Sequence, residues 1–344
     1  MRHRVHELDG IRAVAVLAVF AFHTMPDRLP VGWVGVDVFF VLSGYLITGL
    51  LLAEREGAGR VRLRAFYVRR AARLYPALLA AVVLAVVVAG STLTDGAVAL
   101  AYLSDVVRWQ GGDLGPLGHT WSLAIEEHFY VLWPLVVIAA RTRTRVATAA
   151  GLLGGGSLAV VCWLAPPFGP LDEPTYNAPH ARMWELLAGC LLACVLPGVR
   201  RQALTGWTLL GAGCTAAAAL GVLAGGWPAR TVALTVATVT ASAGTIAVVA
   251  GGGLRGLAWW PLPQIGVISY GVYLYHFPIA QGVVLAGPRS VQTAAKLAVV
   301  LALAWASHRW VEEPIREAVA RRLAGRRRVR TATTPRSEPT STSA

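Results

Sequence analysis

The segment GWVGVDVFFVLSGYLITGLLLA, residues Gly32–Ala53, decides the fold class of this chain. It holds one charged side chain, Asp37, and it is long enough to cross a bilayer, which takes roughly 20 mostly apolar residues in a helix. The rest of the sequence has the same character, because 56% of its 344 residues are hydrophobic and only 14% are charged. A soluble domain carries about a quarter charged residues. The composition therefore predicts a surface that faces lipid.

Outward from this segment, apolar stretches of similar length recur along the chain. We expect an all-α, polytopic integral membrane bundle with about ten transmembrane helices, in a transmembrane domain that covers residues 1–324. Residues 325–344 are rich in Arg, Thr, Pro and Ser, and they predict a disordered cytoplasmic tail. The ten expected spans are 10–29, 32–53, 76–94, 121–140, 146–165, 182–197, 204–224, 231–250, 263–286 and 291–310.

The net charge of +13 fits membrane topology better than nucleic-acid binding, which we do not expect. In the ten-span arrangement, 24 of the 31 Lys and Arg residues lie on the side of the termini and 4 on the other side. Basic residues collect on the cytoplasmic side of membrane proteins, so both termini are predicted to be cytoplasmic. The preference for Arg over Lys and the richness in Ala, Gly and Val suggest a high-GC bacterium, so the expected location is a bacterial inner (plasma) membrane. The basic tail is expected to touch anionic lipid.

The N-terminus and the cysteines do not predict a cleaved signal peptide, a disulfide or a metal site. Arg12 interrupts the first apolar run, and no small-residue cleavage site precedes Pro26, so we interpret this run as a retained helix and not a signal peptide. The cysteines lie in apolar stretches without a CxxC pair, and neither a disulfide nor a metal site is expected. They are Cys162, Cys190, Cys194 and Cys214.

Two ionisable residues in the first expected helix suggest catalysis, because such residues are costly in lipid and are usually functional. Arg12 and His23 are eleven residues apart, which is roughly 1100° of rotation and about 16 Å of rise, so they share one helix face. Arg12 is then near the cytoplasmic edge, and His23 is just beyond the midplane. A neutral histidine in a dry cavity can act as a general base towards a hydroxyl.

Several further polar residues reach a similar depth and predict one polar cavity in the outer half of the bundle. A carboxylate, either Asp37 or Glu126, is expected to orient His23 as in a catalytic triad. Arg182 and Glu185 are spaced i,i+3, so the alternative is that they simply neutralise each other. The residues at this depth are Asp37, Glu126, Glu127, Arg182, Glu185 and His276.

A cluster of arginines precedes the third expected span on the cytoplasmic side. The run RRAAR places Arg69, Arg70 and Arg73 where they could bind an anion such as a phosphate. The alternative is plain anchoring of the topology by positive charge.

Six blocks, in order, resemble the membrane acyltransferase-3 family, and they cover nearly the whole chain. Any one block is a weak signal, whereas the set is specific. The blocks are LDGIRAVAVLAVFAFH (Leu8–His23), GWVGVDVFFVLSGYLIT (Gly32–Thr48), FYVRRAARLYP (Phe66–Pro76), GHTWSLAIEEHFYVLWP (Gly118–Pro134), ISYGVYLYHFPI (Ile268–Ile279) and HRWVEEPIR (His308–Arg316).

The resemblance implies acyl-CoA, often acetyl-CoA, as the donor, and a carbohydrate or a glycosylated molecule as the acceptor. It implies that Arg12 and His23 are essential, and it matches Arg70, Arg73 and Glu126 to family positions, with Trp121 and Ser122 beside Glu126. The sequence departs from the family at His128, where glutamine is common, which leaves the surroundings of Glu127 less certain. Many relatives carry a soluble esterase-like domain after the last span. This sequence shows none, so the membrane domain is expected to act alone or with a separate partner.

Together these features predict an O-acyltransferase in which His23 deprotonates the acceptor hydroxyl for direct attack on the thioester. Arg12, Arg69, Arg70 and Arg73 are expected to hold acyl-CoA. The residues expected to contact substrate are Trp121, Ser122, Glu185 and His276. A proton-coupled transporter and a carrier that hands the acyl group across the membrane to a partner protein remain as alternatives. The acceptor stays open between polysaccharide, glycolipid and glycosylated metabolite.

Overall fold

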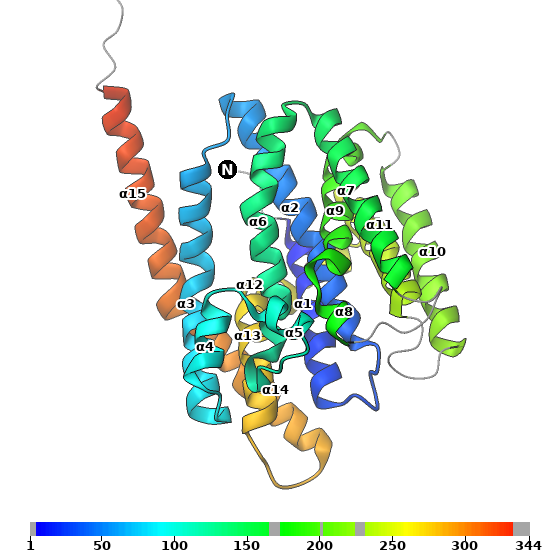
Figure 1. Ribbon diagram of the computed structural model, residues 1–344, viewed down its shortest axis with the longest axis vertical. Coiled ribbons are helices and arrows are strands. Elements are labelled where there is room, and N and C mark those ends of the chain that lie inside the picture. Colours follow the sequence, from blue (N-terminus) through cyan, green and yellow to red (C-terminus); the bar gives the residue numbers. More distant parts are fainter. Residues whose placement is uncertain (1–4, 165–172, 200–201, 224–230, 333–344) are drawn as a thin grey trace, which may run out of the picture.

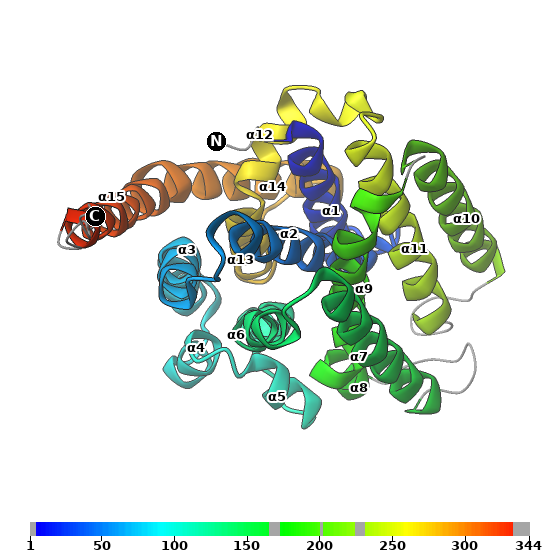
Figure 2. The same ribbon diagram turned by 90° about the horizontal axis from the view of Figure 1, so that it is seen from above.

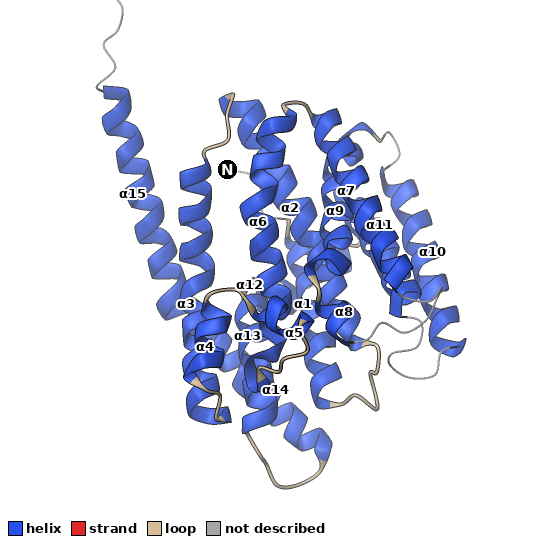
Figure 3. Ribbon diagram, viewed as in Figure 1, coloured by secondary structure: helices blue, strands red, loops and turns tan. Residues whose placement is uncertain are grey.

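The computed structural model describes residues 5–164, 173–199, 202–223 and 231–332, and this described part contains helices and no strand (Figures 1 and 3). The predicted all-α fold is therefore confirmed. The α-helices are α1 (His6–Thr24), α2 (Gly35–Ala58), α3 (Leu63–Ala89), α4 (Leu93–Leu100), α5 (Ser104–Trp109), α6 (Trp121–Ala140), α7 (Arg143–Leu164), α8 (Glu173–Asn177), α9 (Pro179–Val195), α10 (Gln202–Leu223), α11 (Thr231–Ala250), α12 (Pro261–Val267), α13 (Ser269–Gly282), α14 (Arg289–Ser307) and α15 (Glu313–Ala332).

Six helical stretches in the described part are long and apolar enough to cross a membrane, which makes the chain a multi-pass membrane protein. The expected count of about ten spans stays a prediction. The six stretches are Gly32–Ala58, Leu63–Ala89, Gly115–Ala140, Arg143–Leu164, Val232–Ala250 and Arg289–Ala324.

The helices form a bundle in which α1, α2 and α13 lie near the centre (Figure 2). The α10–α11 pair lies at one edge, and α15 leans outwards at the other. The site residues predicted from sequence come mainly from the central helices and from α3 and α6, which flank them. The catalytic candidates are therefore enclosed by protein on most sides.

Helix α1 ends at Thr24, five residues before the expected end of the first span. Pro26 explains the difference, because proline disfavours the helical conformation of the residue before it and has no N–H to donate. Met25 accordingly leaves the helical region, with φ −140° and ψ 58°. His23 therefore lies in the last turn of α1, where the chain turns away from the bundle.

Helix α3 begins at Leu63, thirteen residues before the expected start of the third span. The arginine cluster, expected to precede the third span, lies within α3. Arg69 and Arg73 are thus spaced i,i+4, and Arg70 and Arg73 are spaced i,i+3, so that all three extend from neighbouring positions of one helix surface.

The expected span 263–286 is not one helix, so that prediction is wrong. It is divided into α12 and α13 at Ile268, whose φ of −95° and ψ of 6° are not helical. Helix α12 packs directly against α1, since a Cβ atom at Gly266 would lie 1.9 Å from the carbonyl oxygen of Asp9. The break lets α12 cross α1 while α13 packs along α3 and α14.

The last expected span, 291–310, corresponds to α14, which passes through a π-helical turn, His308–Glu312, into α15. Helix α15 continues to Ala332, beyond the boundary placed at residue 324. The remainder of the predicted tail, 333–344, lies outside the described residues, and the division into domain and tail stays a prediction. Also outside are Arg2, Arg4, Arg200, Arg201, Arg230 and the final residues of spans 146–165 and 204–224.

The 95–120 connection folds into α4, α5 and a 3-10 turn, Gly115–Thr120, at the end of the bundle where α1 also ends (Figure 1). Helix α4 begins with a capping box between Thr92 and Asp95. The Ser104 and Thr120 hydroxyls lie 2.7 Å apart and join α5 to the start of α6. This connection therefore covers the end of the bundle that contains His23.

Close packing of α2 against α9 places charged residues of both helices together. A Cβ atom at Gly44 would lie 1.9 Å from the carbonyl oxygen of Leu186, and one at Gly189 would lie 2.0 Å from that of Val41. Small residues allow such backbone contact between membrane helices. The crossing brings Asp37 of α2 beside Arg182 of α9.

Candidate active site

His23 is paired with a second histidine and not with a carboxylate. Its Nδ1 lies 2.9 Å from the carbonyl oxygen of Val19 and 3.2 Å from Nε2 of His276. His276 is buried, and its own Nδ1 lies 2.5 Å from the carbonyl oxygen of Tyr273. The fold thus joins α1 and α13 through two imidazole rings.

These contacts define the tautomers of both rings. A carbonyl oxygen can only accept, so Nδ1 of each histidine carries a proton. His276 Nε2 then has a free lone pair and accepts from the Nδ1–H group of His23. The same N–H group also faces the carbonyl oxygen of Val19. His23 Nε2 is left unprotonated. An unprotonated Nε2 on an oriented ring is the atom that a general base requires.

His23 lines a cavity of about 440 Å³, which we name the histidine cavity. Its walls are mainly aromatic, and its polar groups include a histidine that the sequence analysis missed, His119. The lining residues are Val19, Phe22, His23, Trp33, Val36, Arg108, Asp113, Gly115, Gly118, His119, Trp121, Glu173, Tyr176, Asn177, Tyr273, Phe277 and Gln281.

Asp37 takes part in a buried ionic cluster and does not orient His23. Its carboxylate binds Arg182, whose Nη1 also lies 3.0 Å from Oε1 of Glu185. All three side chains are almost fully buried. The i,i+3 contact that the spacing of Arg182 and Glu185 allows is therefore present, and Asp37 shares the same guanidinium. Such a cluster is destabilised strongly when one partner is removed.

Glu126 does not pair with His23 either. Its Oε1 accepts a hydrogen bond of 2.5 Å from the Ser43 hydroxyl, and its side chain lines a second cavity that His23 does not line. The expectation of one polar cavity that holds both residues is therefore wrong. Helix α6 points Glu126 towards α2 and α3, while α1 turns His23 towards α13.

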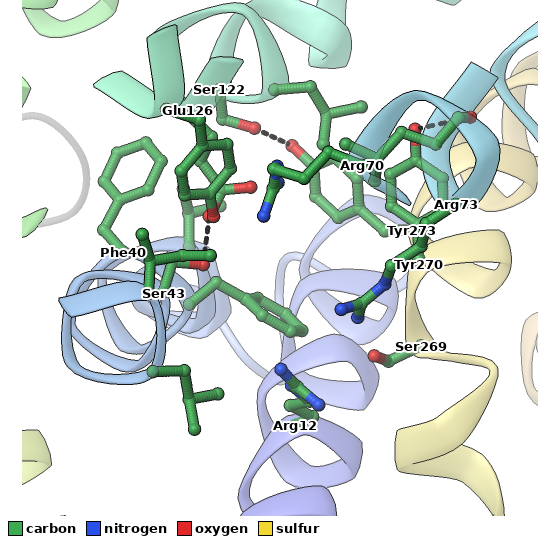
Figure 4. Close-up of a pocket in the computed structure, with 17 residues that line it drawn as sticks. Arg12, Phe40, Ser43, Arg70, Arg73, Ser122, Glu126, Ser269, Tyr270 and Tyr273 are labelled. Atoms are coloured by element: carbon green, nitrogen blue, oxygen red, sulfur yellow. Dashed lines mark hydrogen bonds between the residues drawn. The ribbon is translucent and has the colours of Figure 1, made fainter. Parts of the chain in front are cut away.

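The second cavity, of about 110 Å³, lies among α1, α2, α3, α6 and α13 (Figure 4). We name it the arginine cavity, since Arg12 enters it from α1 and Arg70 and Arg73 enter it from α3. Its other lining residues are Val36, Phe39, Phe40, Ser43, Leu46, Ile47, Leu74, Ser122, Leu123, Glu126, Tyr130, Ser269, Tyr270 and Tyr273.

The arginines of this cavity differ in their partners. Arg70 forms an ion pair of 3.0 Å with Glu127 and lies 3.3 Å over the Tyr130 ring. Arg12 binds Asp9 at 3.2 Å. Arg73 has neither a hydrogen bond nor an ion pair within the described ranges of the chain. Its charge is therefore available to an anion.

Two larger cavities open from the same arginines. One, of about 720 Å³, is lined by Arg12 and Arg73 together with Arg143 and Arg316. The other, of about 520 Å³, is lined by Arg69, Arg70 and Arg73. Arg73 lines all three cavities, whereas Arg69 faces only the last. The expected donor residues thus surround one basic region, with Arg69 at its margin.

The arginine and histidine cavities share part of their lining, because Val36 and Tyr273 line both. The Tyr273 hydroxyl donates to the carbonyl oxygen of His119 at 2.8 Å and lies 2.6 Å from Ser122 Oγ. Trp121 lines the histidine cavity and Ser122 the arginine cavity, so two consecutive residues of α6 face different cavities.

Comparison with known proteins adds to this geometry. An acyltransferase domain of the acyltransferase-3 type matches residues 5–309, which include both cavities. The chain belongs to the membrane acyltransferase-3 family. This is the family that the six motifs indicated, and its assignment confirms the prediction of an acyltransferase.

Two relatives align along most of the chain. The peptidoglycan O-acetyltransferase OatA of Listeria monocytogenes is 30% identical over 92% of this chain and 56% of its own length. The putative peptidoglycan O-acetyltransferase YrhL of Bacillus subtilis is 32% identical over 90% of this chain and 54% of its own length. The chain thus spans about half the length of these relatives. No solved structure matches.

The acyltransferase-3 motifs contain several site residues that sequence reasoning missed. His119 directly precedes the Thr-Trp-Ser-Leu run, and Tyr273 lies in the Ser-Tyr-Gly-Val-Tyr block. Both could have been selected as polar residues within otherwise apolar motifs. Asn177 lies in no motif, and only the packing of α8 places it at the histidine cavity.

Proposed function

We propose that this protein is an integral membrane O-acetyltransferase that takes an acetyl group from acetyl-CoA at the arginine cavity. It places the group on a carbohydrate hydroxyl in the histidine cavity. The observation that carries the proposal is the pair of cavities with different chemistry and a common wall at Val36 and Tyr273. One holds cations suited to an anionic donor, and the other holds an oriented neutral base.

The donor assignment rests on charge. Coenzyme A carries phosphates, and planar guanidinium groups bind phosphate through paired hydrogen bonds. Arg73 has no ionic partner in the part of the chain that is described, and it lies where three cavities meet. Arg12 and Arg70 border the same space, while Arg69 and Arg316 would contact the outer part of the donor.

The chemical step follows from the tautomer of His23. Nε2 removes the proton from the acceptor hydroxyl as the oxygen attacks the thioester carbonyl carbon. The C–S bond then breaks, and the thiolate of coenzyme A accepts that proton from the imidazolium, which returns His23 to its neutral form. His276 accepts from Nδ1–H throughout and keeps the ring in position. No covalent enzyme intermediate is required.

The choice of an acceptor for the histidine cavity rests on the names of the two relatives that align along most of the chain. Both long matches are named for O-acetylation of peptidoglycan, whose glycan strands carry hydroxyl groups. We assign the same acceptor class to this chain, with peptidoglycan glycan as the first candidate.

The orientation follows from the basic residues. The arginine cavity faces the cytoplasm, and the histidine cavity faces the outside of a bacterial inner membrane, with both termini cytoplasmic. Reporter fusions test this, since Gly59 and Gly111 follow helices at opposite ends of the bundle (Figure 1). Gly59 should report inside and Gly111 outside, and the reverse result would overturn the orientation.

The activity is tested with purified protein in lipid nanodiscs, radiolabelled acetyl-CoA and soluble glycan strands prepared from peptidoglycan. We expect alkali-labile label on the sugar, dependent on protein and donor. A parallel reaction with acetyl phosphate tests the donor. Label from acetyl phosphate alone would overturn the choice of acetyl-CoA, and absence of label on any glycan would overturn the acceptor class.

A second candidate is delivery of the acetyl group to a partner protein on the histidine side. The observation that favours it is the division of the site into two cavities, because an acetyl group that reaches the histidine cavity can be passed on from there. The same assay separates the two candidates. Transfer to glycan by the purified chain alone supports direct action, and transfer that requires an added partner supports delivery.

A further inference from the structure

Three aromatic rings form one wall of the histidine cavity. The Tyr176 ring lies 5.7 Å from the Trp33 ring at 85° and 5.4 Å from the Trp121 ring at 65°. These edge-to-face contacts hold the rings in fixed mutual orientations. The rings come from α6, α8 and the 3-10 turn Gly32–Val34, so the tertiary structure alone assembles them.

The buried ionic cluster supports this wall from behind. The guanidinium carbon of Arg182 lies 4.3 Å from the centre of the Tyr176 ring and 5.8 Å from that of Trp121. Asp37 and Glu185 bind the same guanidinium and prevent its movement. Burial also raises the pKa of the Tyr176 phenol well above its usual value, so the ring stays neutral. The cluster thus positions the aromatic wall.

Asn177 adds a polar group at the same wall. It is the single asparagine of the sequence, its side chain is only 2% exposed, and it lines the cavity. Its Nδ2 has no hydrogen-bond partner in the structure. Buried amide groups are normally satisfied, so an unpartnered donor at a cavity wall indicates a ligand oxygen.

Charged residues enclose the mouth of the cavity. Arg108 of α5 binds Glu173 of α8, and its Nη1 lies 3.2 Å from Asp113. These pairs tie the connection between α3 and α6 to α8. The cavity is therefore apolar on one wall and polar at its rim, as is usual for sites that bind small polar molecules.

We propose that the histidine cavity is a sugar-ring site, with Tyr176 and Trp121 as the stacking platform and Asn177 as the donor that selects the ring orientation. The C–H face of a pyranose packs on aromatic rings, and its oxygens accept from Asn177 Nδ2–H. The ring then presents one hydroxyl to His23 Nε2. This assignment rests on the proposed function and names the residues that bind its acceptor.

Binding of the peptidoglycan disaccharide to wild-type protein in nanodiscs, measured by equilibrium dialysis, tests the site without requiring turnover. Asn177→Asp has nearly the same shape but no N–H donor, and it should weaken binding at least tenfold. Tyr176→Leu should do the same through loss of the platform. Acetyl-CoA binding, measured in parallel, should be unchanged in both variants and shows that they are folded.

The matched control is Gln202→Ala, which removes an amide on α10, away from the cavity, where it bonds the carbonyl oxygen of Leu196. It should bind the disaccharide as wild type does. Absence of binding to wild type, or equal affinity for wild type and both cavity variants, would overturn the sugar site. If binding behaves as expected but no acetyl group reaches the sugar, the proposed function fails while the site stands.

Discussion

The arginine cavity and the histidine cavity differ in the charge of their functional residues and in the partners of those residues. In the arginine cavity, cations outnumber the carboxylates that pair with them, and Arg73 keeps an unpaired charge. Beside the histidine cavity, Asp37 and Glu185 share the guanidinium of Arg182, and His23 contacts a second histidine, His276, in place of a carboxylate. An anionic ligand needs the first arrangement. A neutral histidine held in one orientation, as in the second, suits a general base.

The two candidate carboxylates are engaged elsewhere, Asp37 by Arg182 and Glu126 by Ser43, so neither orients His23. His276 provides the same orientation through a neutral acceptor. The comparison predicts that variants at one cavity affect one substrate and spare the other.

The largest effect is expected at His23. His23→Ala should lower turnover by roughly 10²–10⁴-fold, the usual contribution of a general base. Acetyl-CoA binding should persist, because the donor is held by arginines in the other cavity. Turnover and donor binding are measured separately on purified, inserted protein. A variant with wild-type turnover would remove His23 from the mechanism.

Arg73 tests the opposite cavity. Arg73→Ala should raise the donor KM by roughly 10–150-fold, since a hydrogen bond to a charged group contributes about 1.5–3 kcal/mol. The acceptor KM should not change. Arg69→Ala is the matched control. Arg69 lines only the cavity of about 520 Å³, so this variant should have a smaller effect on the donor KM. Equal effects of both variants on the donor KM would mean that the arginines only anchor the topology of the chain and do not bind the donor.

His276 should have a moderate effect. His276→Ala removes the acceptor for His23 Nδ1–H, and turnover should fall about tenfold, as expected for a neutral hydrogen bond. His276→Gln can place an amide oxygen near the position of Nε2 and should recover most of the activity. A pH–rate profile adds a second readout, because loss of the His276 contact should shift the acidic limb, on which a general base loses its proton. Failure of glutamine to rescue would indicate a packing role.

The smallest effect is expected at Glu126. Glu126→Gln keeps an acceptor for the Ser43 hydroxyl but removes a negative charge from the arginine cavity. The acceptor KM should stay within about fivefold, since a contact worth about 1 kcal/mol or less changes a binding constant by at most about that factor. A large rise in the acceptor KM with an unchanged donor KM would place Glu126 in the acceptor site and contradict the separation of the cavities.

Helix type and approximate position were predictable from sequence, because lipid requires long apolar helices whatever their neighbours. The expected span 121–140 coincides with α6, and 231–250 coincides with α11. Errors occurred where local chemistry or packing intervened, at Pro26, in the amphipathic start of α3 and at the break before Ser269. Periodicity alone cannot show that a helix continues past the membrane or divides inside it.

The sequence by itself determined the membrane class, the family and the Arg12–His23 face of one helix, because these depend on composition, motifs and helical geometry. Only the tertiary structure decided which residues meet. It paired His23 with His276, joined Asp37 to Arg182, directed Glu126 to the arginine cavity and placed Asn177 in the wall of the histidine cavity. The physical reason is that membrane depth restricts a residue to a layer, whereas helix rotation and close contacts such as Gly44 against Leu186 select its neighbours within that layer.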